Sequence, residues 1–119
     1  MDGAFARAFD QGQWTLNALA ASVSEWHARE LPGKPSMVRV AKVAEETGEM
    51  IGAHIKAAEL DRRDGRDRLA ESWDEWADVV ISAMGAAEAL GIADPDEWLA
   101  RRWAVVRGRR FATADRVST

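Results

Sequence analysis

Apolar residues recur at every third or fourth position along this chain, which is the spacing of helices with one buried face. One such stripe consists of Val40, Ala44, Gly48, Ile51, Ile55 and Ala58. The alternation of apolar and polar residues that is typical of strands does not occur in any long segment. The pattern therefore predicts an all-α fold.

Proline, glycine and capping residues divide the chain into four predicted helices. We expect them over residues 13–30, from a cap at Ser36 to about Leu60, from about Asp67 to a cap at Gly91, and from Pro95 to about Arg107. Asp94 is the expected cap of the last helix, because proline follows it and Glu97 stands at the third helical position. The short charged segment 61–66 predicts an antiparallel hairpin between the second and third helices.

The third predicted helix is apolar on nearly every side over residues 79–90. One chain with four helices has little material to cover such a surface. We therefore expect a homodimer or homotetramer in which symmetry mates complete the bundle. Trp73 and Trp76 lie on the main stripe of this helix, so both are expected in the core.

The chain has 119 residues, of which 47% are hydrophobic and 30% charged. This composition excludes a disordered tail and predicts one domain over residues 1–119. No uncharged run is long enough to cross a membrane, and the first ten residues carry two aspartates where a secretory signal would be apolar. We expect a cytoplasmic protein with no membrane partner.

Few side chains are available for metal or nucleophilic chemistry. The absence of cysteine and the wide separation of the two histidines exclude a thiolate nucleophile, a zinc ribbon and a histidine-rich metal site. Any metal must be held by oxygen. The net charge is -4, with six arginines gathered after residue 98, so stable nucleic-acid binding is not expected.

The most informative motif is E-E-x-x-E at residues 45–49, followed by E-x-x-D at residues 75–78. At about 100° per residue, Glu46 and Glu49 lie about 60° apart on one helix face, and Glu75 and Asp78 obey the same rule. Measured along the helix axes from the turn of the predicted hairpin, the two pairs are offset by only about 4 Å, given a rise of 1.5 Å per residue. The two pairs are therefore predicted to face each other.

Four carboxylates so close together would repel one another unless a divalent cation lay between them. Mg²⁺ is the expected ion because it prefers oxygen ligands, and Mn²⁺ could substitute. Asp78 directly precedes the apolar run and is expected to be partly buried, where a bare charge is costly. The alternative is an ordinary exposed acidic face, since glutamate is a good helix former.

The sequences E-E-T-G-E at 45–49 and D-E-W-A-D at 74–78 resemble the MazG-type nucleoside triphosphate pyrophosphohydrolases, the all-α NTP pyrophosphatase superfamily. A spacer of 25 residues between Glu49 and Glu75 suits this family, and the resemblance covers about residues 26–111. It implies a four-helix MazG-like bundle completed by oligomerisation. It also implies Mg²⁺-dependent hydrolysis of a nucleoside or deoxynucleoside triphosphate to the monophosphate and pyrophosphate.

The resemblance implies roles for the motif residues. The metal-ligand positions are Glu46, Glu49, Glu75 and Asp78, and the catalytic group is Glu45, Glu46 and Glu49. Glu45 points about 100° away from Glu46, so orienting a water suits it better than binding the metal. Which carboxylate accepts the proton of the attacking water stays open.

Phosphate binding is expected from basic side chains near the carboxyl terminus, where the family usually carries them. The candidates are Arg101, Arg102, Arg107, Arg109 and Arg110, with Arg107 and Arg110 preferred. Lys42 and Lys56 share a side of their helix with the acidic motif, so they can either reach phosphate or pair with those acids. Trp26 is the candidate for stacking on the base, although its apolar stripe favours core packing.

Two other functions stay open at this point. One is a phosphoribosyl-ATP pyrophosphatase-like enzyme, which shares the reaction type and the helical scaffold. The other is a metal-free helical dimerisation or interaction module, in which the acidic residues only make the surface polar.

Overall fold

The computed structural model describes residues 14–59 and 65–109, with side chains for 14–59 and 70–109. Over these residues it has four helices and no strand: α2 (Leu16–Glu30), α3 (Ser36–Glu59), α4 (Gly65–Ala89) and α5 (Pro95–Arg107). The all-α prediction is confirmed for this part of the chain. None of these helices combines the length and apolar character needed to cross a membrane.

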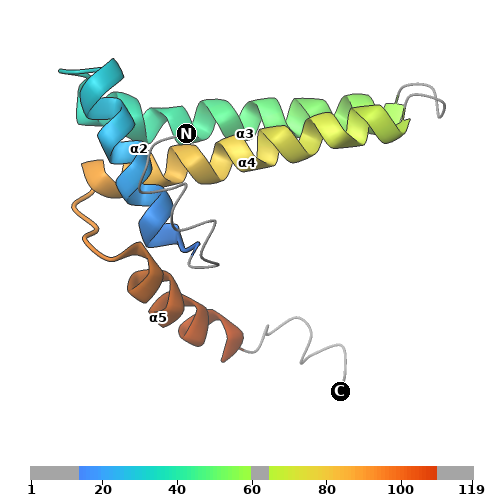
Figure 1. The fold of residues 1–119 in the computed structure, drawn as a ribbon. Coiled ribbons are helices and arrows are strands. Elements are labelled where there is room, and N and C mark those ends of the chain that lie inside the picture. The colour runs from blue at the N-terminus through green and yellow to red at the C-terminus, as the bar shows by residue number, and fades with distance from the viewer. Residues whose placement is uncertain (1–13, 60–64, 110–119) are drawn as a thin grey trace.

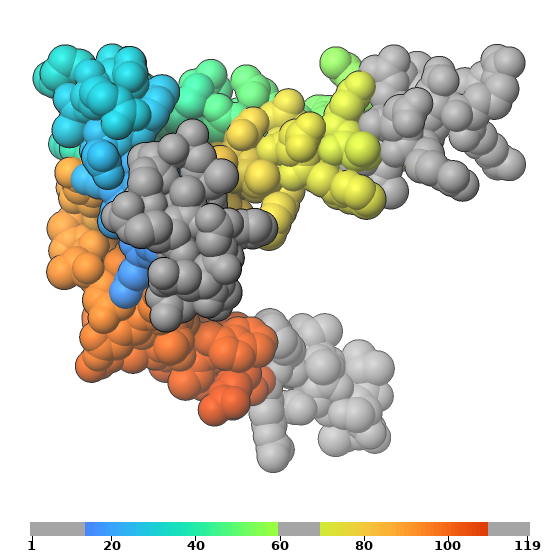
Figure 2. All heavy atoms as spheres, viewed as in Figure 1, coloured from blue at the N-terminus to red at the C-terminus, as the bar shows by residue number. Residues whose placement is uncertain are grey.

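The two longest helices, α3 and α4, lie side by side as an antiparallel hairpin, as predicted (Figure 1). Helix α2 packs across α4 at the end of the hairpin where α3 begins and α4 ends. Helix α5 contacts α2 and diverges from the hairpin, so that its atoms form a separate arm (Figure 2).

The first helix is shorter than predicted. Thr15 is its N-cap, and the side-chain oxygen of Thr15 accepts a hydrogen bond from the backbone N–H of Ala18 at 3.0 Å. A capping threonine has extended backbone, so the helix starts at Leu16 and not at residue 13.

The start of α5 is tied to the start of α2. Asp94 caps α5 as predicted, accepting the N–H of Glu97 at 3.1 Å. The carboxylate of Asp96 accepts the backbone N–H groups of Leu16 and Asn17, each at 3.2 Å. The side-chain oxygen of Asn17 accepts the Asp96 N–H in return, at 2.9 Å. These bonds satisfy free donors at two helix ends and fix the direction in which α5 leaves.

Two predicted boundaries in the hairpin shift. Ser36 is the first helical residue of α3 and does not stand before the helix as its cap. Helix α4 begins at Gly65, so two residues expected in the connection belong to the helix. The predicted cap at Gly91 is confirmed: its φ is 77°, and the N–H of Ile92 donates to the carbonyl of Ala87 at 2.9 Å.

The core is small and lies where α2 crosses α4. Its buried hydrophobic residues are Val23, Met84, Ala86 and Ala87. Gly85 permits the close approach, because a Cβ at this position would lie 2.9 Å from the Cε1 atom of His27 on α2. The apolar carboxyl-terminal half of α4 is thus partly covered within one chain.

The prediction that Trp73 and Trp76 lie in the core is wrong for the single chain. Their exposed fractions are 64% and 60%. Both belong to the half of α4 that α2 does not cross, where α3 is the described helix that packs along α4 (Figure 1). The stripe exists as the sequence indicates, but nothing in the described part of the chain covers it.

Candidate metal site and its cavity

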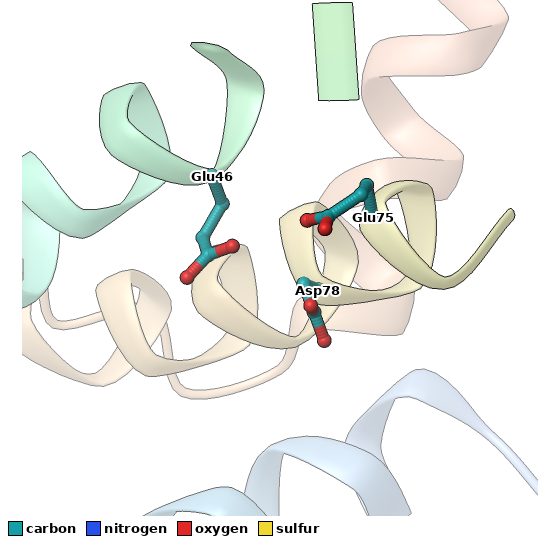
Figure 3. A group of neighbouring side chains, drawn as sticks. All are labelled: Glu46, Glu75 and Asp78. Atoms are coloured by element: carbon teal, nitrogen blue, oxygen red, sulfur yellow. The ribbon is translucent and has the colours of Figure 1, made fainter. Parts of the chain in front are cut away.

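Three of the predicted carboxylates come together between the hairpin helices. Glu46 extends from α3 toward α4, from which Glu75 and Asp78 project (Figure 3). Each offers one oxygen, and these three oxygens lie within 4.8 Å of one another. The i, i+3 spacing on α4 and the antiparallel packing against α3 produce this arrangement.

Burial makes this group chemically unusual. Glu46 is buried and Glu75 half-buried, and the Oε2 atom of each is buried without a hydrogen-bond partner among the described residues. Leaving such an acceptor unpaired is costly. A hard divalent cation takes oxygen ligands of this kind, so the donor set fits Mg²⁺ or Mn²⁺.

Asp78 differs from its prediction. It was expected to be partly buried, yet it is exposed in the single chain. Its side chain lines an open cavity together with residues of α2 and α3, instead of lying under a packed helix. Its carboxylate is therefore the member of the group that solvent or a ligand reaches most easily.

Lys42 neutralises part of the negative charge on α3. Its Nζ lies 3.0 Å from Oε1 of Glu46 and 3.3 Å from Oε1 of Glu45. The hydrogen bond from Lys42 lowers the pKa of Glu46, and its bonds to Glu46 and Glu45 raise the pKa of Lys42. Lys42 was expected either to reach phosphate or to pair with the acidic residues, and the structure shows the ion pairs.

The remaining motif residues lie beside the three-carboxylate group. A hydrogen bond with Glu46, followed by the negative charge of Glu46, raises the pKa of Glu49. Glu49 thus contacts the group without supplying one of its three clustered oxygens. Glu45 is exposed, and its carboxylate is paired with Lys42.

A cavity of about 350 Å³ opens beside the carboxylates. It is lined by Trp26 of α2, by Glu46 and Asp78, and by the basic side chains of Lys34, Arg39 and Lys42. Trp26 has an exposed fraction of 46%, so it is not a core residue in the single chain. The predicted base contact therefore shares a cavity with two of the predicted metal ligands.

The structure does not bring the predicted phosphate-binding residues together. Lys56 is exposed and lines a different cavity, of about 370 Å³, with Glu49 and Glu75. Arg107 is the exposed last residue of α5, on the arm that diverges from the hairpin (Figure 1). Arg110 lies outside the described residues. Within one chain the carboxylates therefore have basic neighbours from α3 and not from α5.

Sequence reasoning missed Lys34 and Arg39 as cavity residues. The available signal was helical spacing, since Arg39, Lys42 and Glu46 follow at i, i+3 and i+7 on one face of α3. Lys34 precedes the helix and lies in a turn. Its backbone N–H donates to the carbonyl of Leu31 at 3.3 Å. No helical periodicity could have placed a residue in that turn.

Comparison of the chain with protein-family models, with curated proteins and with solved structures finds no match.

Proposed function

We propose that this chain is a Mg²⁺-dependent nucleoside triphosphate pyrophosphohydrolase, as its resemblance to the MazG-type enzymes implies. The observation that carries the proposal is the group formed by Glu46, Glu75 and Asp78, which come from two helices and hold three oxygens within 4.8 Å. Among the described residues, Oε2 of Glu46 and Oε2 of Glu75 are also buried without a hydrogen-bond partner. An exposed acidic face used only for solubility would need neither the clustered oxygens nor the buried ones.

When bound, Mg²⁺ would neutralise phosphate oxygens and increase the acidity of a coordinated water. The net reaction adds one water across the α–β anhydride and yields a nucleoside monophosphate and pyrophosphate. Glu46, Glu75 and Asp78 would hold the ion. Glu75 and Asp78 would do so from one helix face, which keeps their separation fixed while the substrate binds.

Glu49 is the carboxylate best suited to accept the proton of the attacking water. It lies against Glu46 but outside the three clustered oxygens, and its contact with Glu46 raises its pKa. A carboxylate with a raised pKa is a stronger base than an ordinary one. Lys42, already paired with Glu46 and Glu45, would keep these two carboxylates oriented.

The proposal includes a homodimer or homotetramer. Trp73 and Trp76 are exposed on one half of α4, and Ile51 and Ile55 are exposed on α3, the helix that packs along α4. A tryptophan side chain buries about 150–250 Å² when fully covered, and 64% and 60% of these two are still exposed. Covering the exposed part would therefore contribute roughly 2–4 kcal/mol each at about 25 cal/mol per Å². A second copy of the same hairpin would bury both sets at once.

Pyrophosphate release from a panel of nucleoside and deoxynucleoside triphosphates tests the activity. We expect release with Mg²⁺ and none with excess chelator, together with the matching monophosphate. Release of orthophosphate only, or equal rates with and without the metal, would contradict the proposal. Turnover of phosphoribosyl-ATP alone would move the assignment to the phosphoribosyl-ATP pyrophosphatase group.

The exposed tryptophans also favour a second candidate, a metal-free helical interaction module. Thermal unfolding distinguishes the two. An enzyme with the proposed site gains stability from Mg²⁺, because only the folded chain assembles the three carboxylates. An interaction module has the same Tm with Mg²⁺ and with chelator.

A further inference from the structure

The cavity beside the carboxylates has a basic end that the proposed metal site does not use. Glu46 and Asp78 lie on its acidic side, whereas Lys34 and Arg39 line it where α2 turns into α3. Lys42 stands between these two parts and is already paired with Glu46. One concave surface thus presents carboxylates and basic groups next to each other.

The basic groups retain unused hydrogen-bonding capacity. Arg39 has a side chain only 18% exposed and pairs through its NH1 with Glu88 at 3.0 Å. Among the described residues, its Nε is buried without a hydrogen-bond partner, and so is Nδ1 of His27 on α2. No ion pair of Lys34 is found within residues 14–59 and 70–109.

The local charge at this end is positive. The pKa of His27 is lowered first by burial and then by the positive charges of Arg39 and Lys34. The carboxylate of Glu88 opposes this effect but ranks below both. The positive charges of Arg39 and Lys34 near His27 therefore favour an anion at this end of the cavity.

We infer that Lys34 and Arg39 form a phosphate subsite, which holds phosphate groups of the nucleotide whose scissile anhydride lies at Glu46 and Asp78. This inference rests on the proposed function and assigns phosphate binding to the α2–α3 corner of the same chain. Charged donors in a sheltered cavity bind phosphate oxygens strongly. Arg107, on the diverging arm, is not needed for this contact.

Pyrophosphate, a product of the proposed reaction, is the probe for this subsite. Calorimetric titration of the full chain with pyrophosphate in Mg²⁺ would compare the wild type with Lys34→Gln. Lys34 is the residue to change because, unlike Arg39, it is not engaged in an ion pair that supports α4. Loss of one charge-assisted contact should weaken binding about tenfold.

The matched control is Arg29→Gln, which removes one positive charge from the neighbouring end of α2. Arg29 pairs with Glu25 and Glu30 and does not line this cavity. Its pyrophosphate affinity should stay within about twofold of the wild type. Equal losses in both variants would mean that only the overall charge matters, which would overturn the subsite.

The two histidines give a second readout that does not depend on activity. His27 lines the cavity, whereas His54 is exposed on α3 away from it. In a ring-proton NMR spectrum, pyrophosphate with Mg²⁺ should shift the His27 signals and leave those of His54 in place. Shifts at neither ring, with binding detected by calorimetry, would place the anion elsewhere and overturn the inference.

Nucleotide hydrolysis in the same samples separates the two proposals. If the wild type hydrolyses triphosphates and Lys34→Gln binds pyrophosphate as tightly, only the subsite fails. If pyrophosphate shifts His27 and Lys34→Gln weakens its binding, but no nucleotide is hydrolysed, the subsite stands and the proposed reaction fails. Absence of any pyrophosphate binding to the wild type contradicts both.

Discussion

The two halves of α4 differ in how well a single chain covers them. In the carboxyl-terminal half, small residues such as Gly85, Ala86 and Ala87 are buried because α2 crosses there. In the preceding half, Trp73 and Trp76 have exposed fractions of 64% and 60%. Glu75 and Asp78 stand where these halves meet. The comparison shows that one helix both completes a core within the chain and presents an apolar surface outward.

The largest expected effect concerns the carboxylates in and beside the candidate metal site, where the two halves meet. Asp78→Asn and Glu49→Gln should each lower pyrophosphate release by about 100-fold or more, at least as much as the loss of a residue that only supports a metal ligand. Circular dichroism should be unchanged, because an amide of the same shape replaces each carboxylate. Glu25→Gln, on the exposed face of α2, is the control. Full activity in both variants would remove these residues from the site.

The uncovered half is tested by its tryptophans. Trp73→Glu combined with Trp76→Glu should convert the proposed assembly to a monomer of 13.1 kDa in light-scattering measurements, because two charges would then be buried at the contact. Trp73→Phe with Trp76→Phe keeps the apolar surface and should keep the assembly. A wild type that is already monomeric at high concentration would contradict the proposal that a second copy covers this half.

The covered half is tested by its glycine. A Cβ at Gly85 would lie 2.9 Å from Cε1 of His27, so Gly85→Ala must displace the His27 ring and loosen the contact with α2. Gly48→Ala on α3 adds a Cβ with no atom within 4 Å and should stabilise the helix by about 0.5–1 kcal/mol. We expect Gly85→Ala to be less stable than Gly48→Ala by about 1–3 kcal/mol in urea unfolding. Equal stabilities would mean that α2 does not pack tightly on α4.

The smallest expected effect is a pH dependence from the same contact. Burial, followed by the charges of Arg39 and Lys34, lowers the pKa of His27 below its ordinary value of 6.5. The unfolded chain then binds this proton more readily, so the stability that neutral His27 contributes is lost as the pH falls below about 6.5. Between pH 7.5 and 5.5 the Tm of His27→Gln should fall less than that of the wild type. Parallel losses would contradict the role given to this ring.

Periodicity was sufficient to predict the helices, the hairpin and the facing carboxylates, because helical spacing and antiparallel packing fix all three. It could not distinguish a stripe that another helix of the chain covers from one that stays exposed, and so it placed Trp73 and Trp76 in the core. Asp78 was misjudged for a related reason: an apolar sequence neighbour does not determine which helix crosses above it. Lys34 was missed because it lies in a turn, where no repeat constrains direction.

The central claim is that Glu46, Glu75 and Asp78 hold one divalent cation between α3 and α4. Crystals grown with Mn²⁺ test it directly, since the anomalous signal of the ion locates it independently of activity. We predict a peak between these three side chains, with an oxygen of each at about 2.0–2.3 Å from the ion, and no such peak in Asp78→Asn crystals. A wild-type map with no peak there, at a Mn²⁺ concentration that supports turnover, would contradict the account.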